Sequence, residues 1–140
     1  MIVYDPVKLM HSIIAGLVSV SACSHISTIS ACTIGSIGAI IYLACRKLFK
    51  KYSIDDPLDA SIVHGICGLW GLLAVGIFDK DEGILNSGST HLLKIQIGGG
   101  LILIAWSSLI CGTFFKIMKS IGRFRVPYIY EVIGIDLMMH

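Results

Sequence analysis

The sequence contains few charged residues. Lys, Arg, Asp and Glu together make up 14% of its 140 residues, whereas hydrophobic residues make up 55%. An ordinary soluble domain has about 25% charged residues, so this composition indicates an integral membrane protein. The net charge of +2 is small, and the cations stand at the ends of apolar segments, which argues against binding to nucleic acid.

The sequence also lacks paired cysteines and a signal peptide. There is no Cys-x-x-Cys pair and no histidine at zinc-finger spacing from a cysteine. The N-terminus lacks the basic start, short apolar core and cleavage site of a signal peptide, so we expect the apolar segments themselves to direct membrane insertion. We interpret five single cysteines as buried, reduced apolar residues: Cys23, Cys32, Cys45, Cys67 and Cys111.

Four segments approach the roughly 20 apolar residues that a helix needs to cross hydrocarbon. They are residues 7–22, 29–48, 57–78 and 92–118. The first is the shortest and carries His11, so hydropathy supports it least, whereas the fourth is long enough to cross with a tilt. The sequence therefore predicts an all-α integral membrane domain over residues 1–121, followed by a tail over residues 122–140.

The cations alternate between the loops on the two sides of the membrane. The connection between the first and second segments has no Lys or Arg, and Lys80 is outnumbered by acidic residues between the third and fourth. By the positive-inside rule, both termini are expected in the cytoplasm. The cations on the expected cytoplasmic side are Lys8, Arg46, Lys47, Lys50, Lys51, Lys116, Lys119, Arg123 and Arg125.

Acidic residues and a proline precede the third segment. Asp56 is placed to cap the helix, Pro57 suits the first helical position, and Asp59 would complement the helix dipole. We interpret Asp55, like Asp56, as part of a helix cap rather than a cation ligand. These residues would mark one mouth of the membrane domain.

Glycines follow this cap at three-residue steps, at Gly65, Gly68 and Gly71. Such a stripe lets membrane helices approach closely. His64 lies on or beside the stripe, so we expect it to face protein rather than lipid.

A titratable ring within hydrocarbon is costly and by default marks a transport pathway or a cofactor site. A neutral imidazole donates at one nitrogen and accepts at the other, which suits His64 to a proton relay. Two alternatives stay open. His64 could simply hydrogen-bond a backbone carbonyl, or it could ligate haem with His11, His25 or His91. The haem alternative is the weaker, because His25 and His91 fall in or near loops.

The string DDPLDASIVHGICGLWG at residues 55–71 closely resembles the penultimate helix of ammonium transporters of the Amt branch of the Amt/Rhesus family. Downstream, GRFRVP at residues 122–127 is similar to the start of the family's cytoplasmic tail, as are Glu131, Gly134 and Asp136. A weaker match is AGLVS at residues 15–19. The matches cover nearly the whole chain in the family's order and spacing.

The resemblance implies a plasma-membrane homotrimer that transports ammonium, has no cofactor and is not an enzyme. Each subunit would carry its own pore within eleven helices. His64 matches the second of a pair of pore histidines. Arg125, Glu131, Gly134 and Asp136 match tail positions that touch the pore's inner mouth and a neighbouring subunit.

The chain corresponds only to the last four of those eleven helices. The other pore histidine and the phenylalanine gate belong to segments that this sequence does not contain. We therefore expect a C-terminal fragment of an ammonium transporter that is inactive alone. The alternative is a non-conducting subunit that modulates a full-length trimer.

Overall fold

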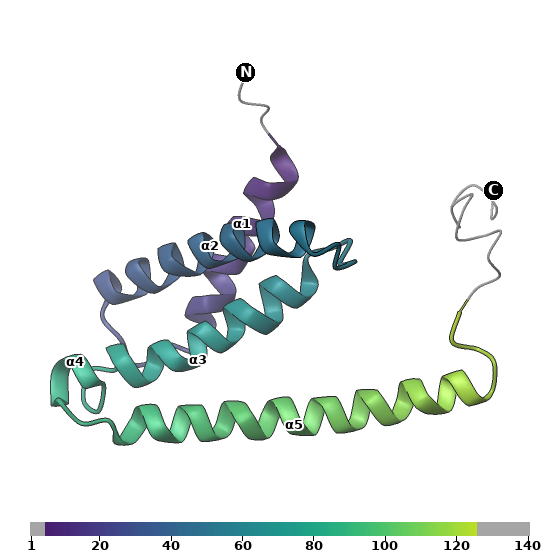
Figure 1. The fold of residues 1–140 in the computed structure, drawn as a ribbon. Coiled ribbons are helices and arrows are strands. Elements are labelled where there is room, and N and C mark those ends of the chain that lie inside the picture. The colour runs from purple at the N-terminus through teal and green to yellow at the C-terminus, as the bar shows by residue number, and fades with distance from the viewer. Residues whose placement is uncertain (1–4, 126–140) are drawn as a thin grey trace. The chain divides into compact units, whose positions relative to one another are not determined.

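The computed structural model describes residues 5–125, and every regular element in that range is a helix. Figure 1 shows the elements in chain order. The all-α fold predicted from the sequence is therefore confirmed. The elements are α1 (Pro6–Ser21), α2 (Thr28–Lys51), the π-helix η1 (Ser61–Ile66), α3 (Cys67–Phe78), α4 (Ile84–Ser87) and α5 (His91–Ser120).

Among residues 5–125, three helices are long and apolar enough to cross a membrane: Thr28–Lys51, the continuous helix Ser61–Phe78 formed by η1 and α3, and His91–Ser120. The apolar helix α1 is shorter, with 16 residues. The structure differs from the sequence prediction at two points. The third helix begins about one turn after Pro57, and the short helix α4 follows the third segment.

Local capping explains where the first two helices begin. The Asp5 side chain accepts a hydrogen bond from the Lys8 backbone N–H, and a proline occupies the first position of α1. The Ser27 hydroxyl likewise accepts from the Ser30 N–H at the start of α2. Lys50 and Lys51 occupy the last turn of α2, where positive charge complements the helix dipole.

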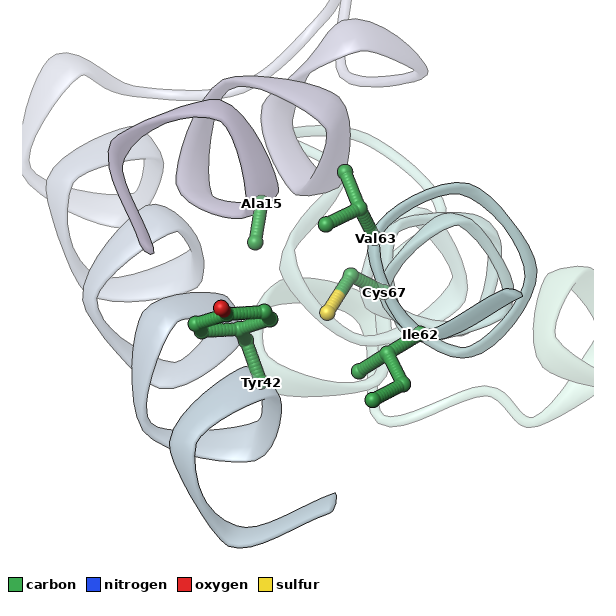
Figure 2. Packing of buried hydrophobic residues seen from close by; sticks show 5 residues of the cluster. All are labelled: Ala15, Tyr42, Ile62, Val63 and Cys67. Carbon is green, nitrogen blue, oxygen red and sulfur yellow. The ribbon is translucent and has the colours of Figure 1, made fainter. Parts of the chain in front are cut away.

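The helices α1, α2 and η1–α3 pack against one another around a small core. Figure 2 shows its side chains converging from the three helices. Tyr42 of α2 lies fully buried among them, with its large aromatic ring in the core. The cluster is made of Ala15, Tyr42, Ile62, Val63 and Cys67.

Close backbone approach occurs where α1 crosses its neighbours. A Cβ atom built on Gly71 would overlap the backbone oxygen of Ser19, and one on Gly38 would overlap the Ser19 hydroxyl. That hydroxyl donates to the Ala15 carbonyl at 2.8 Å and lies 3.3 Å from the Cys67 carbonyl. Small residues therefore let the three helices share one contact point.

The chain divides into two compact units between Gly100 and Leu101. In the first unit, the beginning of α5 packs on α3, because a Cβ on Gly76 would lie 2.6 Å from the Leu93 Cα. In the second unit, nearly all described residues are exposed, including apolar ones.

The cysteines are all free, as predicted, but their burial is uneven. Cys67 is buried, whereas Cys32 and Cys111 are exposed on α2 and α5. The prediction that every cysteine is buried is therefore wrong for the described part of the chain.

Candidate functional site

A network of polar side chains joins the three helices at one end of the bundle, around the carboxylate of Asp59. The Tyr42 hydroxyl donates to Asp59 Oδ2 at 2.7 Å. His11 Nδ1 lies 3.1 Å from the same oxygen, and Arg46 Nε is also 3.1 Å from it. We call these four side chains the polar anchor, because residues of α1 and α2 meet there at the entry to η1.

Helix geometry places three members of the polar anchor, and a turn places the fourth, Asp59. Tyr42 and Arg46 are four residues apart on α2 and so share one face. His11 lies in the first half of α1, which runs antiparallel to α2. Asp59 has a φ of +52°, an uncommon conformation for a residue with a side chain. That turn sends its carboxylate inward, while its carbonyl accepts from the Ile62 and Val63 N–H groups.

The anchor is largely shielded from solvent. The Asp59 and Arg46 side chains are only 12% and 15% exposed. Buried charges need partners, and Arg46 Nη1 has a second carboxylate 3.7 Å away in Asp5. Burial raises the pKa of Asp5, but hydrogen bonds and charge from Lys8, with the charge of Arg46, outweigh it and lower that pKa below its ordinary value.

The predicted cap residues surround this anchor without sharing its role. Asp56 accepts hydrogen bonds from the Ala60 and Ser61 N–H groups at 3.0 and 2.9 Å. Pro57 lies in a turn, not at the first position of a helix, and Asp59 is a buried ion-pair partner rather than an exposed charge near a helix end. A cavity of about 260 Å³ is lined here by Arg46, Phe49, Lys50, Ile54, Asp55, Asp56, Pro57 and Asp59.

His64 lies on the opposite face of η1 from the core. Ile62 and Val63 are buried against α1 and α2, whereas His64 and Gly65 are exposed. A Cβ on Gly65 would meet nothing within 4 Å. Within residues 5–100 His64 therefore projects away from the core of the bundle, and the expectation that it faces protein rather than lipid stays a prediction.

The three glycines of the stripe differ in what they contact. Gly71 touches the α1 backbone, a Cβ on Gly68 would lie 3.9 Å from Val18 Cγ1, and Gly65 has no such neighbour. Contact with α1 therefore increases along the helix away from His64. The stripe serves two surfaces: the buried crossing with α1 at one end, and the exposed face of His64 at the other.

The remaining predicted residues lie apart from the anchor. His25 is 3.6 Å from carboxylate oxygens of both Asp79 and Asp81, at the other end of the bundle. His91 begins α5. Arg125 is the last described residue, and Glu131, Gly134 and Asp136 lie outside the described range.

Sequence reasoning missed the polar anchor as a unit. From the sequence, Arg46 indicates only the topology, and Tyr42 has no predicted role. The available signal was a phenol and a guanidinium four residues apart on the last turns of an apolar helix, with His11 inside another. Three polar side chains at the same expected depth in the membrane indicate that they share one polar partner. The identity of that partner, Asp59, depends on a turn that the sequence pattern does not predict.

The fold and these sites define a class: a helical membrane protein in which a π-helical segment carries an outward-facing histidine. The chain belongs to the Ammonium Transporter Family, whose sequence model matches residues 4–140. No solved structure matches the chain.

Relatives from distant organisms support the same assignment. Ammonium transporter 3 of Dictyostelium discoideum is 34% identical, covering 98% of this chain and 35% of its own length. Ammonium transporter 1 member 3 of Solanum lycopersicum is 31% identical, and the match covers 98% of this chain and 34% of that protein. Ammonium transporter 1 member 4 of Arabidopsis thaliana is 30% identical, and the match covers 86% of this chain and 27% of that protein. The chain thus spans about a third of the length of these relatives.

Proposed function

We propose that this chain takes part in ammonium transport, with His64 lining a hydrophobic pore that is completed by further transporter helices. The observation that carries the proposal is the exposed position of His64 on a helix whose opposite face is buried. An imidazole is too costly to leave facing lipid, so another protein surface or a water-filled path is expected to cover it.

We also propose that the chain is a fragment that does not conduct ammonium alone. The bundle of α1, α2 and η1–α3 has no buried residue on the His64 side of η1, so it supplies one wall of a pore. The trimer, the plasma-membrane location and the cytoplasmic termini belong to the same proposal, the last on the distribution of Lys and Arg. We propose transport rather than catalysis, in keeping with relatives that are named as transporters.

A non-conducting subunit is the second candidate. Large apolar side chains are exposed along the second half of α5, such as Trp106 at 63% and Leu109 at 62%. These residues could pack on other membrane helices or on lipid. In this case the chain would insert beside a full-length transporter and change its transport rate.

Complementation of a split transporter tests the first candidate. The chain is expressed with the preceding part of Solanum lycopersicum ammonium transporter 1 member 3, in cells that lack ammonium uptake, and radiolabelled methylammonium uptake is measured. Uptake is expected only when both pieces are present. His64→Ala should change its rate or pH dependence, whereas His91→Ala, at the exposed start of α5, should not.

Two outcomes would contradict the proposal. The first is strong uptake by the 140-residue chain alone. The second is unchanged uptake by His64→Ala across the pH range while the two pieces still copurify. If the chain instead lowers or raises uptake by an intact transporter with which it copurifies, the modulating subunit is supported.

A further inference from the structure

A second cavity lies between α1 and α2, at the same end of the bundle as Asp59. Its volume is about 170 Å³. Cations provide four of its five lining residues, and the fifth is a leucine. We call it the basic pocket, lined by Lys8, Leu43, Arg46, Lys47 and Lys50.

The positive charge of the basic pocket is only partly neutralised within the described chain. Asp5 lies 3.3 Å from Lys8 Nζ and 3.7 Å from Arg46 Nη1, and Asp59 pairs with Arg46. Between residues 5 and 125, no ion pair involves Lys47 or Lys50. Asp55 and Asp56 line the adjacent cavity, which Lys50 also borders. Four cations therefore face two directly paired carboxylates.

Arg46 joins the basic pocket to the polar anchor. Its Nε and Nη1 atoms are buried and lie within ion-pair distance of Asp59 and Asp5, so its charge is already directed at carboxylates. The charge left to attract a ligand is therefore mainly that of Lys47 and Lys50. Phosphate oxygens are strong acceptors for such charged donors.

The pocket combines a charged rim with an apolar wall. Lys47 and Lys50 lie in the last two turns of α2, and Lys8 lies in the first turn of α1. Leu43, one turn deeper along α2, is 42% exposed, and Ile40 beyond it is 65% exposed. Cations at the end of a membrane helix above apolar side chains match the polar head and acyl chain of a lipid.

We propose that the basic pocket binds the phosphate headgroup of an anionic phospholipid, whose acyl chain lies along Leu43 and Ile40. Free phosphate would use the same cations but would leave the apolar wall uncovered. A zwitterionic lipid carries its own cation, which the excess charge of Lys47 and Lys50 repels. The site therefore favours lipids with a net negative headgroup.

Lipid binding by the whole purified chain in neutral detergent tests the proposal. The probe is phosphatidylglycerol with a fluorescent acyl chain, and phosphatidylcholine with the same label is the comparison. Lys47→Gln combined with Lys50→Gln should weaken phosphatidylglycerol binding roughly 25-fold, because each lysine near an anionic headgroup contributes about fivefold. Both side chains are exposed, so the helical circular dichroism spectrum should not change.

A matched variant separates the pocket from general surface charge. Lys116→Gln combined with Lys119→Gln removes the same charge from the exposed end of α5 and should leave affinity within about threefold, a change smaller than that from one lysine near the headgroup. Lys47→Arg combined with Lys50→Arg should retain binding.

Several outcomes would overturn the proposal. One is that Lys47→Gln with Lys50→Gln binds phosphatidylglycerol as tightly as the native chain, or loses no more affinity than Lys116→Gln with Lys119→Gln. Another is equal affinity of the native chain for the two lipids. The last is full displacement of phosphatidylglycerol by millimolar inorganic phosphate. The last outcome would identify a site for free anions.

Discussion

Histidine and aspartate meet at both ends of the three-helix bundle, but in different surroundings. At one end His11 contacts Asp59, whose side chain is 12% exposed. At the other end His25 lies 3.6 Å from both Asp79 and Asp81. The His25 side chain is 55% exposed, against 21% for His11, and Asp81 is 78% exposed, whereas Asp79 is nearly as shielded as Asp59. The first contact belongs to a network with Tyr42 and Arg46, whereas the second joins two loops at the surface.

The comparison indicates which end fixes the helices. A buried carboxylate with several donors is costly to disturb, because each donor would lose its partner without regaining water. An exposed pair exchanges with water and contributes little. The Asp59 end should therefore hold the start of η1, and with it the backbone that carries His64, while the His25 end can vary.

Removal of the Asp59 charge should have the largest effect. Asp59→Asn leaves the buried guanidinium of Arg46 without its nearest carboxylate, so the free energy of unfolding should fall by roughly 3–5 kcal/mol. Asp55→Asn is the matched control, because Asp55 is exposed and lines the adjacent cavity. Both variants are unfolded reversibly in mixed micelles and followed by circular dichroism. Equal stability of the two variants would mean that the anchor does not hold the bundle.

A bulky side chain at the helix crossing should have the next largest effect. Gly71→Leu would place its Cβ against the Ser19 backbone, which cannot move without separating α1 from α3, so a loss of about 3 kcal/mol is expected. Gly65→Leu introduces the same side chain on the same helix where nothing lies within 4 Å, and should be nearly neutral in the isolated chain. A similar loss at Gly65 would show that helix propensity, not the crossing, sets the cost.

Loss of one hydroxyl from the anchor should cost less. Tyr42→Phe keeps the buried ring in the core but removes the 2.7 Å hydrogen bond to Asp59, and a bond to a charged acceptor contributes roughly 1.5–3 kcal/mol. The lower part of that range is expected, since His11 and Arg46 still contact the carboxylate. In the same unfolding assay, Tyr52→Phe, at an exposed tyrosine just after α2, should leave stability unchanged.

The sequence predicted the helices much better than the site. Apolar length and charge at the segment ends are local properties, and they placed the long helices within a few residues. The predicted start of the third helix, at Pro57, is wrong, because an Asp-Pro pair is typical of a helix start. In the structure, the buried pairing of Asp59 instead holds the chain in a left-handed turn before the helix begins. The anchor depends on contacts between residues 48 positions apart, such as His11 and Asp59, which no local pattern contains.

At the His25 end of the bundle, the stability that Asp79 contributes should depend weakly on pH and fall as the pH is lowered. Hydrogen bonds from the Glu82 and Asp81 backbone N–H groups lower the pKa of Asp79 below its ordinary value of 3.8, burial opposes them, and His25 adds to the lowering. A carboxyl whose folded pKa lies below its unfolded pKa contributes stability that is complete above the unfolded value and is lost as pH falls through the folded value. The stability difference between the native chain and Asp79→Asn should therefore be present between about pH 5 and 7 and shrink below pH 4. It should also stay smaller than the difference for Asp59→Asn at pH 7, because an asparagine oxygen still accepts from both N–H groups. A constant difference down to pH 3, or one as large as that at Asp59, would remove the distinction between the two ends.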